Sequence, residues 1–136
     1  MKSEFPPAVP EIPVSDVNKA ADYYHHKLGF HLDWVGEDGR IAGISQGQCR
    51  MFLTNPAFRG GSPTETTPPF GNVPPVLIWL NLNSKAEVDD LYQLWKNNQA
   101  RIICEPGDRP WKLHEFTAAD LDGNQFRVFY DFRGDA

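Results

Sequence analysis

The sequence predicts an α+β fold in which one βαβββ unit occurs twice. Two segments carry apolar residues at helical spacing behind a capping residue, and each is followed by three short runs with the polarity of β-strands. Between the copies lies a long stretch, residues 55–75, which is rich in proline and glycine and has no apolar periodicity. We therefore expect a single domain over residues 1–136, made of module one (8–54), this connecting loop and module two (76–132).

Module one begins with a weak strand. Residues 8–14 alternate in polarity but contain Pro10 and Pro13, which restrict them to an edge strand or a strand that leaves its own sheet. Ser15 and Asp16 are candidate N-caps for the helix that follows. The helix and three further strands are expected at residues 17–28, 30–35, 40–45 and 49–54.

Module two repeats this order. A strand over residues 76–82 precedes a capping box from Ser84 to Glu87, which opens the second helix. The inward face of that helix is expected to consist of Val88, Leu91, Leu94 and Trp95. A strand at residues 101–105 follows.

The chain ends in a predicted hairpin. Its strands are residues 112–118 and 125–130, and Asp122-Gly123 is a strong turn signal between them. Alternation places Arg127 and Phe129 on one face of the second strand. The opposite face receives Phe126, Val128 and Tyr130.

Composition excludes several classes of partner. A net charge of -5 without a basic cluster argues against nucleic acid. No apolar run reaches the roughly 18 residues of a membrane span, and the N-terminus lacks the apolar region of a signal peptide, so a cytoplasmic protein is expected. Cys49 and Cys104 lie in apolar runs and are predicted to be buried free thiols.

Three segments of the chain together carry a family resemblance. AVPEIPVSDVNKAADYYHHKLGFHLDW, PPVLIWLNLNSKAEVDDLYQLW and RPWKLHEFTAADLDGNQFRVF resemble the bleomycin-resistance proteins of the glyoxalase/vicinal oxygen chelate superfamily. The resemblance implies two curled mixed sheets around an open cavity. It also implies a homodimer that exchanges N-terminal strands and builds its clefts between subunits. Pro10 falls where that family bends its exchanged strand.

Metal enzymes of this superfamily take ligands from four strands, and matching the motifs identifies the corresponding positions here. They are occupied by Val9, Phe52, Leu77 and Arg127. Two aliphatic side chains, an aromatic ring and a guanidinium cannot hold a divalent ion. We therefore expect no metal and no cofactor.

The histidines do not supply the missing ligands. His25 and His26 are adjacent on a helix and point in different directions, so exposed side chains are expected. His31 is a candidate to line the cavity, and His114 is expected to be a hydrogen-bonded, partly buried imidazole. No arrangement of residues indicates a nucleophile, so no catalytic residue is predicted.

Aromatic side chains are the main candidates for ligand binding. Trp34, Trp79 and Trp111 fall where the resistance proteins carry aromatics that line the drug cleft. Their rings offer stacking area for a planar ligand and a π-face for a cationic group. Trp95, at helical spacing with Val88, is expected in the core instead.

Four polar residues complete the predicted site. Asp33 and Glu115 are candidates to pair with a ligand amine, although alternation puts Asp33 opposite Trp34 unless the strand is bulged. Arg127 is either an internal counter-ion of Glu115 or a group that binds a ligand carboxylate. Thr54 is a possible hydroxyl donor.

The function expected from the resemblance is stoichiometric sequestration of a bleomycin-type glycopeptide, planar and cationic, in clefts of the homodimer. Two alternatives stay open: an enzyme of the same superfamily (lyase, isomerase, thiol transferase or dioxygenase), and a binder of another aromatic metabolite. Phe58 and Phe70 in the connecting loop are candidate lid residues.

Overall fold

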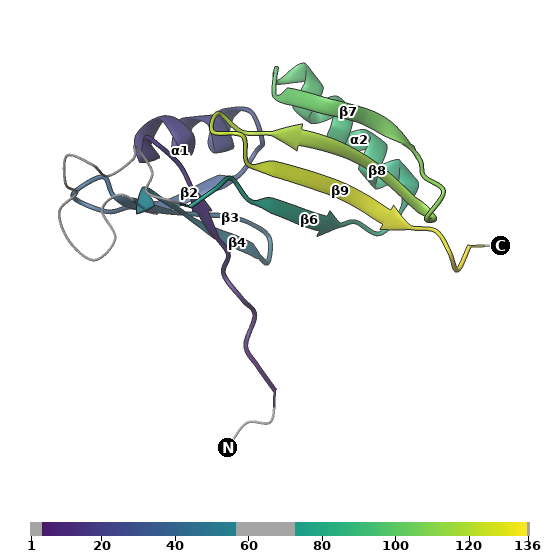
Figure 1. Ribbon diagram of the computed structural model, residues 1–136, viewed down its shortest axis with the longest axis horizontal. Helices are drawn as coiled ribbons and strands as arrows, with labels where there is room; N and C mark the ends of the chain where they lie inside the picture. The colour runs from purple at the N-terminus through teal and green to yellow at the C-terminus, as the bar shows by residue number, and fades with distance from the viewer. Residues whose placement is uncertain (1–3, 57–72, 136) are drawn as a thin grey trace.

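A computed structural model describes residues 4–56 and 73–135 (Figure 1). Its elements follow the order β, α, β, β, β twice, which confirms the predicted repeat. In chain order they are β1 (Glu11–Pro13), α1 (Val17–His26), β2 (His31–Val35), β3 (Ile41–Gln46), β4 (Cys49–Thr54), β6 (Leu77–Asn81), α2 (Lys85–Asn97), β7 (Arg101–Asp108), β8 (Leu113–Ala119) and β9 (Gln125–Asp131).

The strands form two four-stranded mixed sheets with the same internal order. The first has the order β1-β4-β3-β2 and the second the order β6-β9-β8-β7. In each, the first strand of the repeat runs parallel to the last, and the other two pairings are antiparallel. Neither sheet closes on itself, so the curled α+β architecture of the sequence prediction is confirmed.

Each sheet carries one helix, which leaves its other face open. In the second sheet α2 lies behind the strands as seen in Figure 1, with the rings of Tyr92 and Trp95 5.5 and 5.6 Å from that of Phe116. The residues beneath both helices form one core, whose largest fully buried side chains are Trp95, Tyr24, Phe116, Phe126, Ile12 and Ile44. We call the uncovered side of each sheet its open face.

Both helices begin at the predicted caps. The Asp16 carboxylate accepts from the backbone N–H of Lys19 at 3.0 Å. Ser84 Oγ accepts from the N–H of Glu87 at 3.1 Å, while the Glu87 carboxylate accepts from the N–H of Asn83. These contacts satisfy backbone donors that a first helical turn leaves without an intrahelical partner.

A polar junction joins the two repeats at the turn between β8 and β9. Asn124 Nδ2 donates to the carbonyl of Pro13 and to Asp120 Oδ2, both at 2.8 Å, while its Oδ1 accepts from the N–H of Val76. Tyr24 Oη donates to the same Asp120 oxygen at 2.8 Å. We call Tyr24, Asp120 and Asn124 the junction, because their bonds fix the first repeat against the second.

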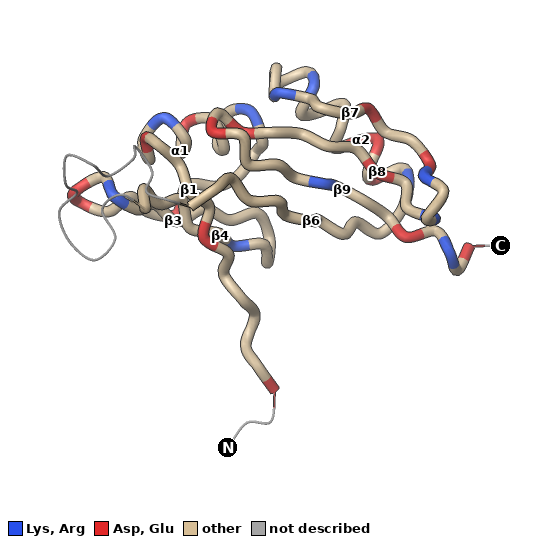
Figure 2. The backbone as a smooth tube through the Cα atoms, in the orientation of Figure 1, with Lys and Arg blue, Asp and Glu red and all other residues tan. Residues whose placement is uncertain are grey.

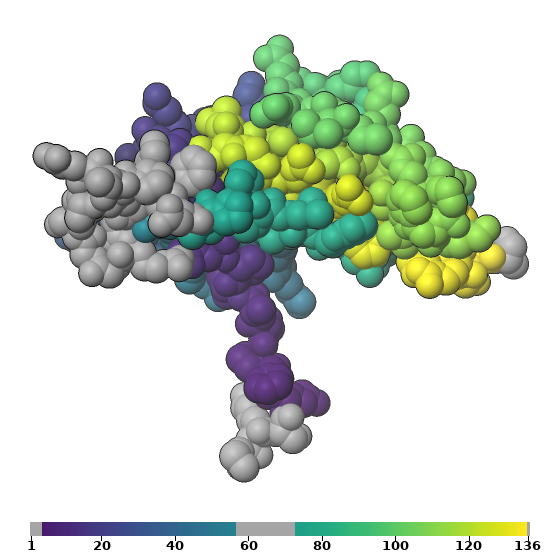
Figure 3. All heavy atoms as spheres, in the orientation of Figure 1, coloured from purple at the N-terminus to yellow at the C-terminus, as the bar shows by residue number. Residues whose placement is uncertain are grey.

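Three expectations about elements need correction. The strand expected at residues 8–14 is ordered as a strand only over Glu11–Pro13, and the segment before it projects from the body (Figures 1 and 3). β7 continues three residues beyond the expected end because register shifts on either side of Cys104 accommodate Pro106 and Gly107. Leu94 is 49% exposed, and Tyr92 takes the expected inward position on α2.

Neither described helix is both long and apolar enough to cross a membrane. Phe58 and Phe70 lie outside the described residues.

Candidate functional site

The open face of the second sheet carries an aromatic and cationic row. Trp79 on β6 is opposite Arg127 on β9, which is opposite Thr117 on β8. The Arg127 guanidinium carbon lies 5.1 Å from the centroid of the Trp79 ring, within the range of a cation–π contact. The Phe129 ring meets Trp79 edge-on at 5.5 Å. Arg127 and Phe129 therefore lie on the same face of β9, as alternation predicted.

The open face of the first sheet carries an uncharged aromatic pair. Trp34 is opposite Gly43, which is opposite Phe52, and the rings of Trp34 and Phe52 are 5.4 Å apart. A Cβ added to Gly43 would lie 2.5 Å from Trp34 Nε1. The missing side chain of Gly43 thus lets the Trp34 indole lie against the sheet.

A register shift between Leu32 and Trp34 brings Asp33 toward this same face. The Asp33 carboxylate accepts from Ser45 Oγ at 2.9 Å and lies 2.7 Å from His31 Nδ1. Hydrogen bonds from His31 and then Ser45 lower the pKa of Asp33. The strand is therefore bulged, which is the condition under which the sequence placed Asp33 on the face of Trp34. The Asp33 carboxylate, however, already has two partners.

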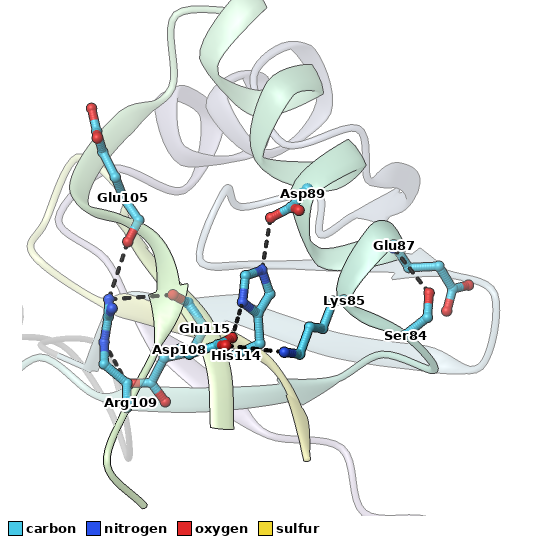
Figure 4. Close-up of polar contacts among 9 residues, drawn as sticks. All are labelled: Ser84, Lys85, Glu87, Asp89, Glu105, Asp108, Arg109, His114 and Glu115. Carbon is cyan, nitrogen blue, oxygen red and sulfur yellow. Dashed lines mark hydrogen bonds and ion pairs between the residues drawn. The ribbon is translucent and has the colours of Figure 1, made fainter. Parts of the chain in front are cut away.

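Glu115 is tied to the loop between β7 and β8 (Figure 4). Its carboxylate is 3.8 Å from Arg109 Nε and accepts weakly from Trp111 Nε1 at 3.4 Å. Arg109 Nη2 also donates to the carbonyl of Glu105 at 3.1 Å. The internal counter-ion of Glu115 is therefore Arg109 and not Arg127, a correction to one of the two predicted roles of Arg127. Glu115 is 4% exposed under this loop.

Thr54 is also engaged within the protein. Its hydroxyl donates to Glu11 Oε1 at 2.7 Å, and the side chain is buried at the end of β4. As positioned, this hydroxyl does not offer its proton to a ligand.

The three predicted cleft tryptophans are all solvent-exposed. Trp34, Trp79 and Trp111 expose 41%, 44% and 51% of their surface, although each is large and apolar. Trp95 is buried and donates from Nε1 to the carbonyl of Leu28, as expected for a core residue. The two groups of tryptophan thus differ in environment as the sequence predicted.

An apolar groove of about 420 Å³ is lined by residues of both repeats. Leu94 and Cys49, which were both expected to be buried, border it. Trp79 also lines it. Cys49 and Cys104 are both free thiols, as predicted. The prediction that they are buried is wrong, because Cys49 is only half-buried and Cys104 is exposed. Burial raises the pKa of the Cys49 thiol, which disfavours its nucleophilic thiolate form.

His114 lies on the helix-covered side of the second sheet, away from the open face. Its Nδ1 is 2.8 Å from Asp108 and its Nε2 is 2.8 Å from Asp89, while Lys85 Nζ is 3.0 Å from Asp108 (Figure 4). The prediction of a hydrogen-bonded, partly buried imidazole is confirmed. His25 and His26 are exposed, and so is His31.

The four positions that correspond to metal ligands do not fit a metal. Val9, Phe52 and Leu77 have no donor atom, and the guanidinium of Arg127 is a donor of hydrogen bonds with no lone pair to offer. Within the described part of the chain, no group of three or more His, Cys, Asp or Glu side chains could hold an ion.

Several residues of these faces escaped sequence reasoning. Phe129 was placed on a face but not in the site, and Arg109 was not considered. Gly43 offered a signal, because a glycine inside a strand often marks a close approach by another group. No local pattern could have paired Arg109 with Glu115, since that contact depends on the path of the loop.

Comparison with known proteins gives a consistent result. A sequence model of the Glyoxalase/Bleomycin resistance protein/Dioxygenase superfamily matches residues 8–128. The bleomycin resistance protein of Geobacillus stearothermophilus is 23% identical over 130 residues, which cover 93% of this chain and 97% of that protein.

Solved structures share the fold. A glyoxalase/bleomycin resistance protein/dioxygenase from Nocardioides aligns with a TM-score of 0.73 at 17% identity, covering 98% of this chain and 88% of that one. A lactoylglutathione lyase from Agrobacterium tumefaciens aligns with a TM-score of 0.69 at 19% identity, covering 93% of this chain and 96% of the other. At these identities the likeness establishes architecture and not activity.

Proposed function

This chain belongs to the Glyoxalase/Bleomycin resistance protein/Dioxygenase superfamily, and we propose that it acts as a binding protein that sequesters a planar aromatic small molecule without chemical change. Bleomycin-type glycopeptides are the first ligand class to test, because the relative from Geobacillus stearothermophilus is named for resistance to bleomycin. The proposed ligand-binding residues are Trp34, Trp79, Trp111 and Arg127, of which the tryptophans supply the stacking surface. Asp33, Glu115 and Thr54, which the sequence also predicted to bind the ligand, already have partners within the protein and would contact a ligand only by exchanging them.

The observation that carries this proposal is the exposure of three tryptophans on or beside the open faces. A folded protein usually buries such large apolar rings, so rings that stay exposed on a sheet face are candidates for a binding surface. Trp34 lies across Gly43, and Trp79 is braced by Phe129, so the neighbouring residues restrict both rings. Flat rings held in place bind a planar ligand at a low cost in side-chain entropy.

The chemistry of the open faces favours binding over catalysis. The positions that supply ligands in metal-dependent members carry Val9, Phe52, Leu77 and Arg127, which do not fit a metal. Glu115 and Thr54 already form internal hydrogen bonds. The described residues of these faces therefore offer the enzymatic alternative no set of metal ligands.

The proposal includes a homodimer whose clefts form between subunits. The carbonyl of Pro10 accepts from the N–H of Phe52, and the residues before Pro10 project away from the body (Figure 3). Phe5, on this segment, is 98% exposed. An extended arm bearing an exposed aromatic residue is suited to anchor on a second copy of the chain. Deletion of residues 2–7 is expected to convert a dimer into a monomer in sedimentation velocity.

The sequestration proposal is tested by titrating the protein with bleomycin while recording tryptophan fluorescence. We expect saturable quenching with a dissociation constant below about 1 μM and near one ligand per subunit. Single substitutions Trp34→Ala, Trp79→Ala and Trp111→Ala should each weaken binding. Leu121→Ala, which removes another exposed apolar side chain at the turn between β8 and β9, serves as the control.

A flat titration up to roughly 100 μM drug, a regime weaker than about -5.5 kcal/mol of binding, would reject bleomycin as the ligand. Quenching that survives all three tryptophan substitutions would reject the open faces as its binding surface.

A further inference from the structure

Arg127 holds an unpaired charge on the open face of the second sheet. It is the only Lys or Arg within β9, where it forms the blue segment between tan neighbours in Figure 2. Its Nε is buried, and it is the one such side-chain polar atom without a hydrogen-bond partner among residues 4–56 and 73–135. No carboxylate in the same ranges forms an ion pair with this guanidinium.

The nearby acidic side chains are committed elsewhere. Glu115, on the same face of the neighbouring strand, pairs with Arg109. Asp131, at the end of β9, pairs with Arg133 at 3.2 Å. An unpaired donor of a charged group costs free energy when it is shielded from water, so the free protein leaves a favourable contact unmade at Arg127. An anion from outside the chain that pairs with the guanidinium would offset this cost.

The neighbours of Arg127 define the rest of the ligand. The exposed Trp79 ring, 5.1 Å from the guanidinium carbon, offers a flat apolar surface beside the charge. Thr117 is the cross-strand partner of Arg127 and contributes a hydroxyl to the same row. A guanidinium recognises a carboxylate through two parallel hydrogen bonds, and an indole recognises an aromatic ring by stacking.

The first repeat lacks this combination. At the position that corresponds to Arg127 it has Phe52, opposite Gly43 and 5.4 Å from Trp34. Its open face therefore presents aromatic surface without an unpaired cation at that position. Two carboxylates on that side already have partners: Asp33 has His31 and Ser45, and Glu11 has Thr54.

From these observations we propose that Arg127 and Trp79 form a subsite for an aromatic carboxylate, with the ring of the ligand against Trp79 and its carboxylate on the guanidinium. The inference rests on the proposed binding function and specifies its ligand as a planar anion, whereas the sequence alone favoured a planar cation.

The test uses two ligands of the same shape, one anionic and one neutral. Calorimetric titration of the full-length protein is carried out with 2-naphthoate and with 2-naphthamide, its neutral analogue of the same shape. We expect naphthoate to bind at least about tenfold more tightly than naphthamide, because only the carboxylate pairs with the guanidinium. Arg127→Gln should weaken naphthoate binding by at least about tenfold more than naphthamide binding, so that the preference is lost.

Two further variants separate the charge of Arg127 from other effects. Arg101→Gln removes an exposed positive charge from β7 of the same sheet and should retain the full preference for naphthoate. Arg127→Lys keeps the charge without the planar fork and should restore only part of the preference. Thermal unfolding confirms that each variant is folded before its titration is interpreted.

Equal binding of both ligands to the unaltered protein would overturn the carboxylate subsite, while aromatic binding would stand. A preference that survives Arg127→Gln would overturn the assignment to Arg127. If bleomycin binds but neither naphthyl ligand does, the subsite is rejected and sequestration is retained. If naphthoate binds with the stated preference and bleomycin does not, the subsite is supported and the glycopeptide is rejected.

Discussion

Asn124 and Arg127 are three residues apart in the chain, yet their polar atoms have opposite surroundings. Asn124 is fully buried, with its amide nitrogen and oxygen both hydrogen-bonded, and these bonds reach both repeats. Arg127 has a buried Nε without a partner. The first arrangement stabilises the fold, because every buried group is satisfied. The second leaves bonding capacity that the fold does not use, which is the property expected of a binding site.

The strongest test of this contrast is Asn124→Ala. The substitution leaves the Val76 N–H and the Pro13 carbonyl without their present partner and removes one of the donors to Asp120. We expect the free energy of unfolding to fall by about 3 kcal/mol or more, since buried polar groups lose their bonds. Urea denaturation measures this change. Asn97→Ala, at the exposed end of α2, is the control and should be nearly neutral.

Tyr24→Phe removes a single bond from the junction and should have a smaller effect. Loss of the hydroxyl that donates to Asp120 is expected to lower the free energy of unfolding by about 1–2 kcal/mol at neutral pH. A loss below a few tenths of a kcal/mol would indicate that this bond contributes little to joining the repeats.

The same variant has a defined pH dependence. Burial, followed by the charge of Asp120, raises the pKa of Tyr24 well above its ordinary value of 10.0. A raised pKa means that the stabilising contribution is present below the unfolded-state pKa and is lost as pH rises through it toward the folded-state pKa. The difference in stability between the unaltered protein and Tyr24→Phe should therefore narrow from about pH 10 upward. A constant difference to higher pH would contradict this assignment.

The sequence predicted the fold well because its periodicities are local. Alternation in the last strand separated Arg127 and Phe129 from the buried Phe126 and Val128, and the structure confirms that separation. A period of two fixes which face each side chain occupies once the strand is known. The same local reasoning identified Trp95 as a core residue.

The site was less predictable because it depends on irregular backbone and on contacts distant in sequence. The register shift between Leu32 and Trp34 interrupts the alternation of side chains, so that Asp33 lies on the same face as Trp34. Alternation alone cannot locate such a shift. Leu94 fits a helical stripe, but the groove between the repeats leaves it exposed. The predicted dimer and its exchanged strand stay predictions, since they concern contacts between two chains.

The cluster around His114 provides an intermediate case between the junction and Arg127. Its polar atoms are paired, as in the junction, but Asp108 and Asp89 are largely exposed. Exposed ion pairs of this kind stabilise proteins weakly. We therefore expect Asp108→Asn to lower the melting temperature by less than Tyr24→Phe does.

The sign of the pH dependence at Asp108 is opposite to that at Tyr24. Hydrogen bonds from Lys85 and then His114 lower the pKa of Asp108. A lowered pKa gives stability that is present above the unfolded-state value of about 3.9 and is lost as pH falls through the folded-state pKa. The effect of Asp108→Asn on the melting temperature should thus vanish in acid. Asp90→Asn, which removes an exposed carboxylate from α2, is the control and should leave the melting temperature nearly unchanged at neutral pH.

Arg127→Met should change stability least, although it removes a charged side chain from a half-buried position. The substitution loses the cation–π contact with Trp79 but also removes the buried donor that lacks a partner, and these two effects on stability oppose each other. Methionine retains apolar contact with the Trp79 ring. We expect the free energy of unfolding to stay within about 1 kcal/mol of that of the unaltered protein, measured by urea denaturation without ligand. A loss of more than about 2 kcal/mol would show that Arg127, like Asn124, serves the fold. A neutral result would mean that the fold does not need this guanidinium, and that its role must be sought in what the open face binds.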